Sequence, residues 1–311
     1  MIRAIRYTDD KNTEWNDFIK NSKNGLFMFN RNFMEYHKDR FSDSSLLFYD
    51  DEKLIAVMPA SIKNDVLSSH GGLTYGGFII SNEIKQHHLN DCLTALKDFA
   101  SHNGINKIIY KTVPHIFHRQ PAEEDLYSLF YNGAKILKIE ASTVVDLQNP
   151  LKMPKGRKAQ VSRARRDGVL IKESEDFDSF INLENKVLEE RHGTKAVHTA
   201  KELTLLKSYF PENIILMGAF LQDKMIAGTV LFVYENAVHT QYMAANETAR
   251  EIGALDLAIA TVIEQYRNSK KWLDFGISTE NDGHYLNEGL ISQKEGFGGR
   301  TNVYQTWIIE V

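Results

Sequence analysis

One order of helix and strand signals occurs twice in this 311-residue chain, and the repetition limits the folds that the chain can adopt. In each half, two segments with apolar residues at helical spacing precede two β-type runs that a short polar turn joins. A strand, a long helix and another strand then follow in the same order. The strings at residues 51–56 and 222–227 also align directly, with Lys53 matching Lys224. An internal duplication is the best explanation of this pattern.

Each half is expected to form one α/β unit. The elements expected in the first half are helices over 13–19 and 31–41, a hairpin of 45–49 and 54–58, a glycine-rich strand over 69–80, a helix over 89–100 and a strand over 108–110. Those in the second half are helices over 177–188 and 203–210, a hairpin of 214–220 and 225–230, a strand over 237–245, a helix over 252–266 and a strand over 272–275. A helix between two strands is a crossover, which usually makes the strands parallel neighbours. We therefore predict an α/β (α+β) fold with mixed sheets covered by helices on both faces.

The predicted domains are residues 1–150 and 173–311, with a basic linking segment at 151–172 between them. The net charge is −4, so any attraction to a polyanion must come from such a local patch. The sequence contains no apolar run long enough for a membrane-spanning helix, and a cytoplasmic location is expected. The single cysteine, Cys92, rules out an internal disulfide and is expected to be a buried, inert thiol.

The basic segment is a candidate phosphate-binding site. Over residues 152–172 a single acid, Asp167, accompanies these cations: Lys152, Lys155, Arg157, Lys158, Arg163, Arg165, Arg166 and Lys172. A helix would place several of them on one side, and phosphate is their natural partner. Arg157 and Arg163 are therefore substrate-binding candidates. The alternative is a solvated helix face that only connects the domains.

The glycine-rich segment 69–77 is a second binding candidate. Its glycines permit close backbone approach and expose N–H groups to an anionic or carbonyl oxygen. It lacks the spacing of a P-loop or of a dinucleotide fingerprint. His70, Tyr75 and Gly76 are the residues that we assign to substrate binding here. The alternative is a bulged strand whose glycines make room for a neighbouring element.

With these motifs in place, the sequence resembles tandem GNAT acyltransferases of the FemABX branch, over roughly residues 15–307. The glycine-rich segment resembles the corresponding strand of the first FemAB-like domain, and residues 155–169 resemble the basic segment between the domains. Residues 272–276 and 294–299 resemble the family's "DFG" and "K-x-GF" ending. The resemblance implies two tandem GNAT-like domains. The two halves have diverged unequally, so we expect one composite active site at their junction.

The resemblance also implies an N-acyltransferase that acts on an amine of a cell-envelope precursor, such as an amino-sugar nucleotide or a peptide. In such a reaction an amine attacks an ester or thioester held in a splay between strands. Lys294 is the leading catalytic candidate, as a cation that stabilises charge on the acyl donor. Asp274 and Glu280 are candidate bases, although Asp274 could instead cap the residues after it. Tyr242 is a candidate acid, and His239 on the same predicted strand is a substrate-binding candidate.

The expected donor is acetyl-CoA or another acyl-CoA. GNAT enzymes hold its pyrophosphate at the N-terminus of the crossover helix. Here Arg250, Gly253 and Ala254 match only part of that motif, and we assign them to cofactor binding. The mismatch leaves open an aminoacyl-tRNA-dependent peptidoglycan aminoacyltransferase.

The eleven histidines show no metal-ligand spacing, so no metal is expected.

A third alternative is a non-catalytic tandem module that binds a phosphorylated ligand. The sequence does not indicate an oligomeric state.

Overall fold

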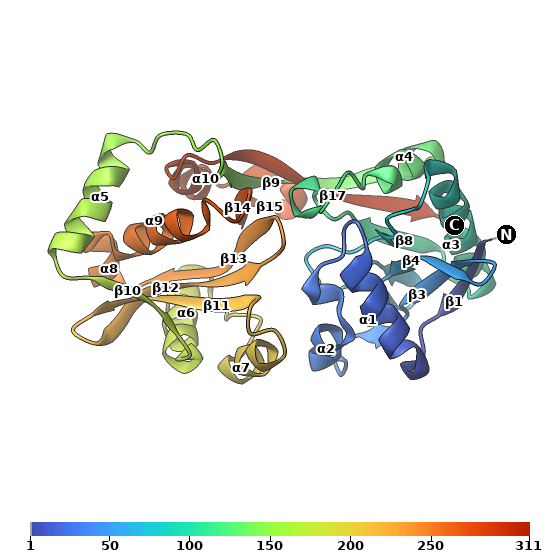
Figure 1. The fold of residues 1–311 in the computed structure, drawn as a ribbon, viewed down its shortest axis with the longest axis horizontal. Coiled ribbons are helices and arrows are strands. Elements are labelled where there is room, and N and C mark those ends of the chain that lie inside the picture. Colours follow the sequence, from blue (N-terminus) through green and yellow to red (C-terminus); the bar gives the residue numbers. More distant parts are fainter. Residues whose placement is uncertain (1) are drawn as a thin grey trace. The chain divides into compact units, whose positions relative to one another are not determined.

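The chain passes between two structural units more than once (Figure 1). The structure is a computed structural model that describes residues 2–311. Unit 1 extends to Glu140 and also contains Asn281–Gly283 and Val303–Val311, whereas unit 2 contains Ala141–Glu280 and His284–Asn302. The sequence instead predicted contiguous domains at 1–150 and 173–311. The structure divides the chain differently because the C-terminal strand pairs with a strand of unit 1, and because the basic segment packs within unit 2.

Unit 1 contains two small sheets and the helices that cover them. Its helices are α1 (Asn12–Asn21), α2 (Arg31–Met34), α3 (Gln86–His102) and α4 (Glu124–Tyr131). One sheet has the order β1-β3-β4-β7, from Ile2–Arg6, Leu46–Asp50, Lys53–Met58 and Ile79–Ile80. The other has the order β2-β5-β6-β8-β17, from Ser42–Asp43, Ser61–Lys63, Val66–Ser68, Lys107–Lys111 and the last part of Arg300–Glu310. The apolar face of α3 packs against these strands in one buried core.

Unit 2 is built around one mixed sheet. The strand order is β10-β11-β12-β13-β14-β9, from Leu170–Ser174, Ile214–Leu221, Lys224–Val233, Ala237–Ala245, Trp272–Ile277 and the second part of Lys135–Asp146. Its helices are α5 (Lys155–Arg166), α6 (Phe177–His192), α7 (Ala200–Tyr209), α8 (Glu247–Ile252), α9 (Ala254–Tyr266) and α10 (Glu288–Glu295). A two-stranded ribbon joins β15 (Thr279–Glu280) to β16 (Tyr285–Leu286). Among the described strand pairs of unit 2 in this sheet, β13 and β14 run parallel, as the crossover helix between them requires, and the others are antiparallel.

Helices cover both faces of the unit 2 sheet, and α6 and α9 lie on opposite sides of β12 and β13 (Figure 1). Phe180 of α6 packs close to Gly228 on one face. Ile259 and Val262 of α9 pack with Val238 and Leu273 on the other. The predicted mixed sheet with helices on both faces is confirmed for this unit.

Two predictions about unit 1 are wrong. The glycine-rich stretch is a strand only at Ile79–Ile80, and residues 69–78 form turns and irregular backbone. His70 and Gly77 have φ angles of 56° and 74°, which lie outside the extended range of a regular strand. The predicted helix over 31–41 is only α2 followed by a 3₁₀ turn at Glu35–His37, although Arg31, Phe33, Met34 and His37 are all buried.

Candidate functional site

The parallel strands β13 and β14 of unit 2 pair over only three residues before they separate. Ala237, Val238 and His239 pair with Trp272, Leu273 and Asp274. Beyond this point β13 continues beside β12 to Ala245, whereas β14 pairs with β9 at Ile277. We call the point after His239 and Asp274 the strand split. Beyond it no pairing of β13 with β14 continues among the described residues, and the polar side chains described next lie around it.

A bulge in β13 decides which side chains lie on which face at the split. The register of β13 against β12 shifts between Tyr242 and Thr240, so Gln241 is an extra residue. Val238 and Met243 therefore both pack in the cluster with α9, although they are five positions apart in the sequence. His239 and Tyr242 consequently both lie on the α6 face. A regular strand would place them on opposite faces, so the sequence alternation alone does not explain their common orientation.

Asp274 is the centre of a buried polar cluster on this face. Its side chain is fully buried, its Oδ1 accepts a hydrogen bond of 2.5 Å from Ser142 Oγ, and its Oδ2 lies 2.5 Å from His239 Nδ1. Both carboxylate oxygens are thus occupied by side chains from β9 and β13. These contacts suit Asp274 to orient His239.

Lys294 on α10 is buried and reaches the end of β14. Its Nζ donates to the carbonyl oxygens of Gly276 at 2.9 Å and Ile277 at 2.6 Å. Gly276 has a φ of 71°, and a methyl group on it would lie 3.3 Å from His239 Cε1. Burial lowers the pKa of Lys294 to about 8, and the charge of Asp274 opposes this change. The structure therefore brings Lys294, Asp274 and His239 together around one turn.

Tyr242 lies farther along β13 and contacts a residue that the sequence interpretation missed. Its hydroxyl lies 2.7 Å from His198 Nδ1 and accepts from the His198 backbone N–H at 3.3 Å. Burial raises the pKa of Tyr242 to about 12, so its hydroxyl stays protonated at neutral pH. His198 is on the loop between α6 and α7, where the sequence has no periodic signal. Glu280, the other candidate base, is exposed and accepts from the Asn287 side-chain amide at 3.0 Å.

The N-terminus of α9 is packed against α5. The three residues that the sequence assigns to cofactor binding lie here. Arg250 is exposed, and Gly253 and Ala254 are buried. A methyl group on Gly253 would lie 2.8 Å from the carbonyl oxygen of Gln160. Asp256, in the first turn of α9, forms an ion pair with Arg157. Because a carboxylate and a neighbouring helix already occupy this helix end, a CoA pyrophosphate does not fit there as it does in GNAT enzymes.

The basic segment forms α5, and its two assigned residues differ in environment. Arg157 is partly buried, donates to the Gln293 carbonyl oxygen at 3.0 Å and stacks over Phe297. Arg163 is exposed and lies 3.6 Å from Asp167. The exposed cations of α5 are Lys155, Lys158, Arg163, Arg165 and Arg166. Arg157 therefore holds α5 in place, while the other cations remain accessible.

His70, Tyr75 and Gly76 belong to unit 1. His70 is buried, and burial lowers its pKa to about 3. The Tyr75 hydroxyl lies 3.3 Å from that of Tyr304, and a methyl group on Gly76 would meet the Ser69 carbonyl oxygen at 2.2 Å. Lys111 Nζ donates to the carbonyl oxygens of His70 and Leu73. The segment is thus a packed loop.

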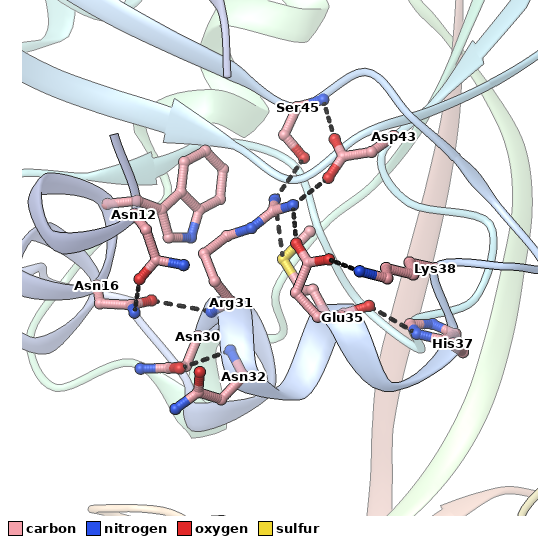
Figure 2. A network of polar contacts seen from close by, with 12 residues as sticks. Asn12, Asn16, Asn30, Arg31, Asn32, Glu35, His37, Lys38, Asp43 and Ser45 are labelled. Atoms are coloured by element: carbon pink, nitrogen blue, oxygen red, sulfur yellow. Dashed lines mark hydrogen bonds and ion pairs between the residues drawn. The ribbon is translucent and has the colours of Figure 1, made fainter. Parts of the chain in front are cut away.

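A pocket of about 400 Å³ in unit 1 is lined in part by His70 and by Arg31. Figure 2 shows the guanidinium of Arg31 between Glu35, Asp43 and Ser45, each of which accepts a hydrogen bond from it. The centroid of the Tyr7 ring lies 3.8 Å from Cζ of Arg31. Since these contacts join the first helices to the strands, Arg31 is a structural anchor.

Among the side chains that the structure describes, those of residues 2–190 and 193–311, no group of three or more histidines, cysteines, aspartates or glutamates could hold a metal ion. The described helices include none with the length and apolar character needed to cross a bilayer.

No family model matches the sequence, and no curated protein matches it. Several solved structures match nearly the whole chain. FemX is 13% identical, with 97% of this chain and 96% of FemX covered and a TM-score of 0.68. L-PGS from Bacillus licheniformis is 12% identical, with 98% and 92% covered and a TM-score of 0.65. A tandem GNAT protein from the clavulanic acid biosynthesis pathway is 9% identical, with 100% and 98% covered and a TM-score of 0.55.

Proposed function

We propose that this chain, which has the tandem GNAT fold of the FemABX-like acyltransferases, transfers an acyl group from an activated ester or thioester to an amine. The observation that carries the proposal is the strand split of unit 2, where a buried lysine, a buried carboxylate and a histidine surround the point at which β13 and β14 separate. Charged groups held in such a dry setting act strongly on charge that develops nearby.

Lys294 would stabilise the oxygen of the tetrahedral intermediate. An ammonium group has three N–H donors, and carbonyl oxygens of β14 take two of them in Lys294. The third can bond to the developing oxyanion. Asp274 would act indirectly, because its contacts with Ser142 and His239 hold the histidine ring in one orientation.

The donor would be an acyl-CoA held by contacts other than the α9 N-terminus, or an aminoacyl-tRNA. Two observations on α5 favour aminoacyl-tRNA as the donor. This helix packs against the place where GNAT enzymes bind pyrophosphate, and it exposes Lys155, Lys158, Arg163, Arg165 and Arg166. A row of exposed cations suits a polyanion such as tRNA, and the binding would weaken steeply with salt.

The acceptor would be an amine of a cell-envelope precursor, an amino-sugar nucleotide or a peptide, in the cytoplasm. This part of the proposal is supported by the resemblance of the sequence motifs to FemAB-like proteins. It is also supported by the structural likeness to FemX and to a lysylphosphatidylglycerol synthetase domain, which has a TM-score of 0.66.

The test is a mass-spectrometric screen of acyl-CoAs and charged tRNAs against UDP-amino sugars and muropeptides. Product formation that Lys294→Ala abolishes and Lys201→Ala preserves is the expected result, since Lys201 is an exposed lysine on α7 of the same unit. Binding of phosphorylated ligands without any product would instead favour the non-catalytic module. A product that forms equally in Lys294→Ala would remove the role given to this lysine.

A further inference from the structure

A carboxyl group lies buried on the apolar side of α6. The inward-facing positions of this helix hold Phe177, Phe180 and Ile181, and Glu184 follows at the same spacing. Glu184 is 6% exposed, and its Oε2 has no hydrogen-bond partner among the described residues. Helix periodicity alone would place an apolar residue here.

Keeping this carboxyl buried costs stability. Burial raises the pKa of Glu184 to about 7, because the carboxylate form loses its hydration inside the protein. Fold stability gains nothing from a buried acid whose Oε2 has no hydrogen-bond partner among the described residues, whereas a leucine would extend the apolar face of α6. Groups with such perturbed titration are concentrated at functional sites.

One titratable group that Glu184 acts on is Tyr242 of β13. The charge of Glu184 acts on Tyr242, whose hydroxyl is bonded to His198. The bulge at Gln241 places Tyr242 on the α6 face with His239, and His239 borders the strand split. The segment of α6 that carries Glu184 therefore covers the part of β13 that leads from the split.

We propose that Glu184 is the general base that binds and deprotonates the acceptor, and that the acceptor is a primary amine that arrives as an ammonium ion. This inference rests on the proposed acyl transfer. A proton passes from the ammonium nitrogen to the Glu184 carboxylate, which frees the lone pair. The nitrogen then forms a bond to the acyl carbonyl carbon. As the carbon–oxygen or carbon–sulfur bond of the donor breaks, the second nitrogen proton passes to the leaving group, and Glu184 releases its proton to water.

The first test uses the whole chain with the donor and acceptor that turn over in the screen. Glu184→Gln keeps the shape of the side chain and removes the base, and we expect kcat to fall by about 100-fold or more. Glu190→Gln is the matched control, since Glu190 is an exposed glutamate on the same helix. Its kcat should stay within about twofold of the original. Activity of Glu184→Gln equal to that of the unchanged chain would overturn the inference.

The second test needs no turnover, so it separates failure of Glu184 from failure of the proposed acyl transfer. The carboxyl carbon of Glu184, labelled with carbon-13 and assigned with Glu184→Gln, is followed by NMR as pH is varied, with and without ethylammonium chloride. We expect its pKa to fall when ethylammonium is present, because a bound cation stabilises the carboxylate. An unchanged Glu184 titration would overturn the inference, even if the chain transfers acyl groups. Absence of turnover together with a lowered pKa would retain the ammonium site and reject the transfer.

Discussion

His239 Nδ1 lies 2.5 Å from Asp274 Oδ2, across the last pair of residues that β13 and β14 share. The contact closes the paired part of the two strands, and the strands separate immediately beyond it. Ser142 Oγ holds the other oxygen of Asp274, so strands β9, β13 and β14 meet at one carboxylate. The buried pair therefore ties the geometry of the split to the stability of the sheet.

Asp274→Asn should destabilise unit 2. The amide cannot accept from both Ser142 and His239, and an unsatisfied group would stay buried. We expect the free energy of unfolding to fall by about 2–4 kcal/mol, measured by urea denaturation. Asp178→Asn, at an exposed position on α6, should change it by less than about 0.5 kcal/mol. Equal stabilities of the two variants would show that the cluster does not support the fold.

Transfer activity should decline above about pH 8. The pKa of Lys294 is lowered to about 8 by burial, and the proposed role needs the ammonium form. Lys294→Arg keeps its charge at high pH, so any activity that this variant retains should lack the alkaline decline. The kcat profile between about pH 7 and pH 10 measures the difference. A decline that persists unchanged in the arginine variant would assign it to another group.

The stability conferred at Glu184 should depend on pH in the direction opposite to that of an ion-paired carboxylate. Its folded pKa of about 7 lies above the ordinary glutamate value of 4.5, so the folded chain binds the proton more tightly. The contribution of Glu184 is therefore fully present below the unfolded pKa and is lost as pH rises to about 7. As pH rises from about 4.5 to about 8, the unchanged chain should lose stability that Glu184→Gln keeps. The difference in the free energy of unfolding should therefore shift in favour of the variant by up to about 3 kcal/mol. Urea denaturation at both pH values checks this, and a difference that is constant with pH would contradict it.

Gly253→Ala should loosen the packing of α5 against α9. Gly168→Ala is the matched control, since Gly168 has a similar φ of 82° against 78° for Gly253, but nothing lies within 4 Å of its added methyl group. Both variants bear the strain of a positive φ, which costs about 1–2 kcal/mol. Only Gly253→Ala meets the Gln160 carbonyl oxygen, which should add about 1–3 kcal/mol. If thermal unfolding shows that both variants are destabilised equally, α5 accommodates the methyl group at position 253 without further loss of stability.

The regular elements of unit 2 could be predicted because their apolar residues are strictly periodic. The predicted strand over 237–245 is β13, and the predicted strand over 272–275 is contained in β14. Short or atypical elements were missed. The strand β10 is half exposed, and α10 has mostly polar residues, so neither carries a clear apolar period. The glycine-rich stretch predicts a strand, but Lys111 holds part of it as a loop through a contact that no local sequence pattern shows.

The residues of the candidate site also fall into those that the sequence could identify and those that it could not. Lys294, Asp274 and His239 could be selected from sequence because charged or polar residues stand beside recognisable motifs. Glu184, His198 and Ser142 could not be selected, since each is a single polar residue whose significance depends on its neighbours in space.

By itself, the sequence determined the duplicated order of helices and strands, because apolar periodicity is a local property of the chain. The tertiary structure decided where β13 and β14 separate, that the bulge at Gln241 puts Tyr242 on the face of His239, and that α5 covers the N-terminus of α9. These features depend on strand register and on contacts between residues far apart in the chain. Burial and charge act through space, so only the folded chain brings Glu184 to Tyr242 and Lys294 to the end of β14.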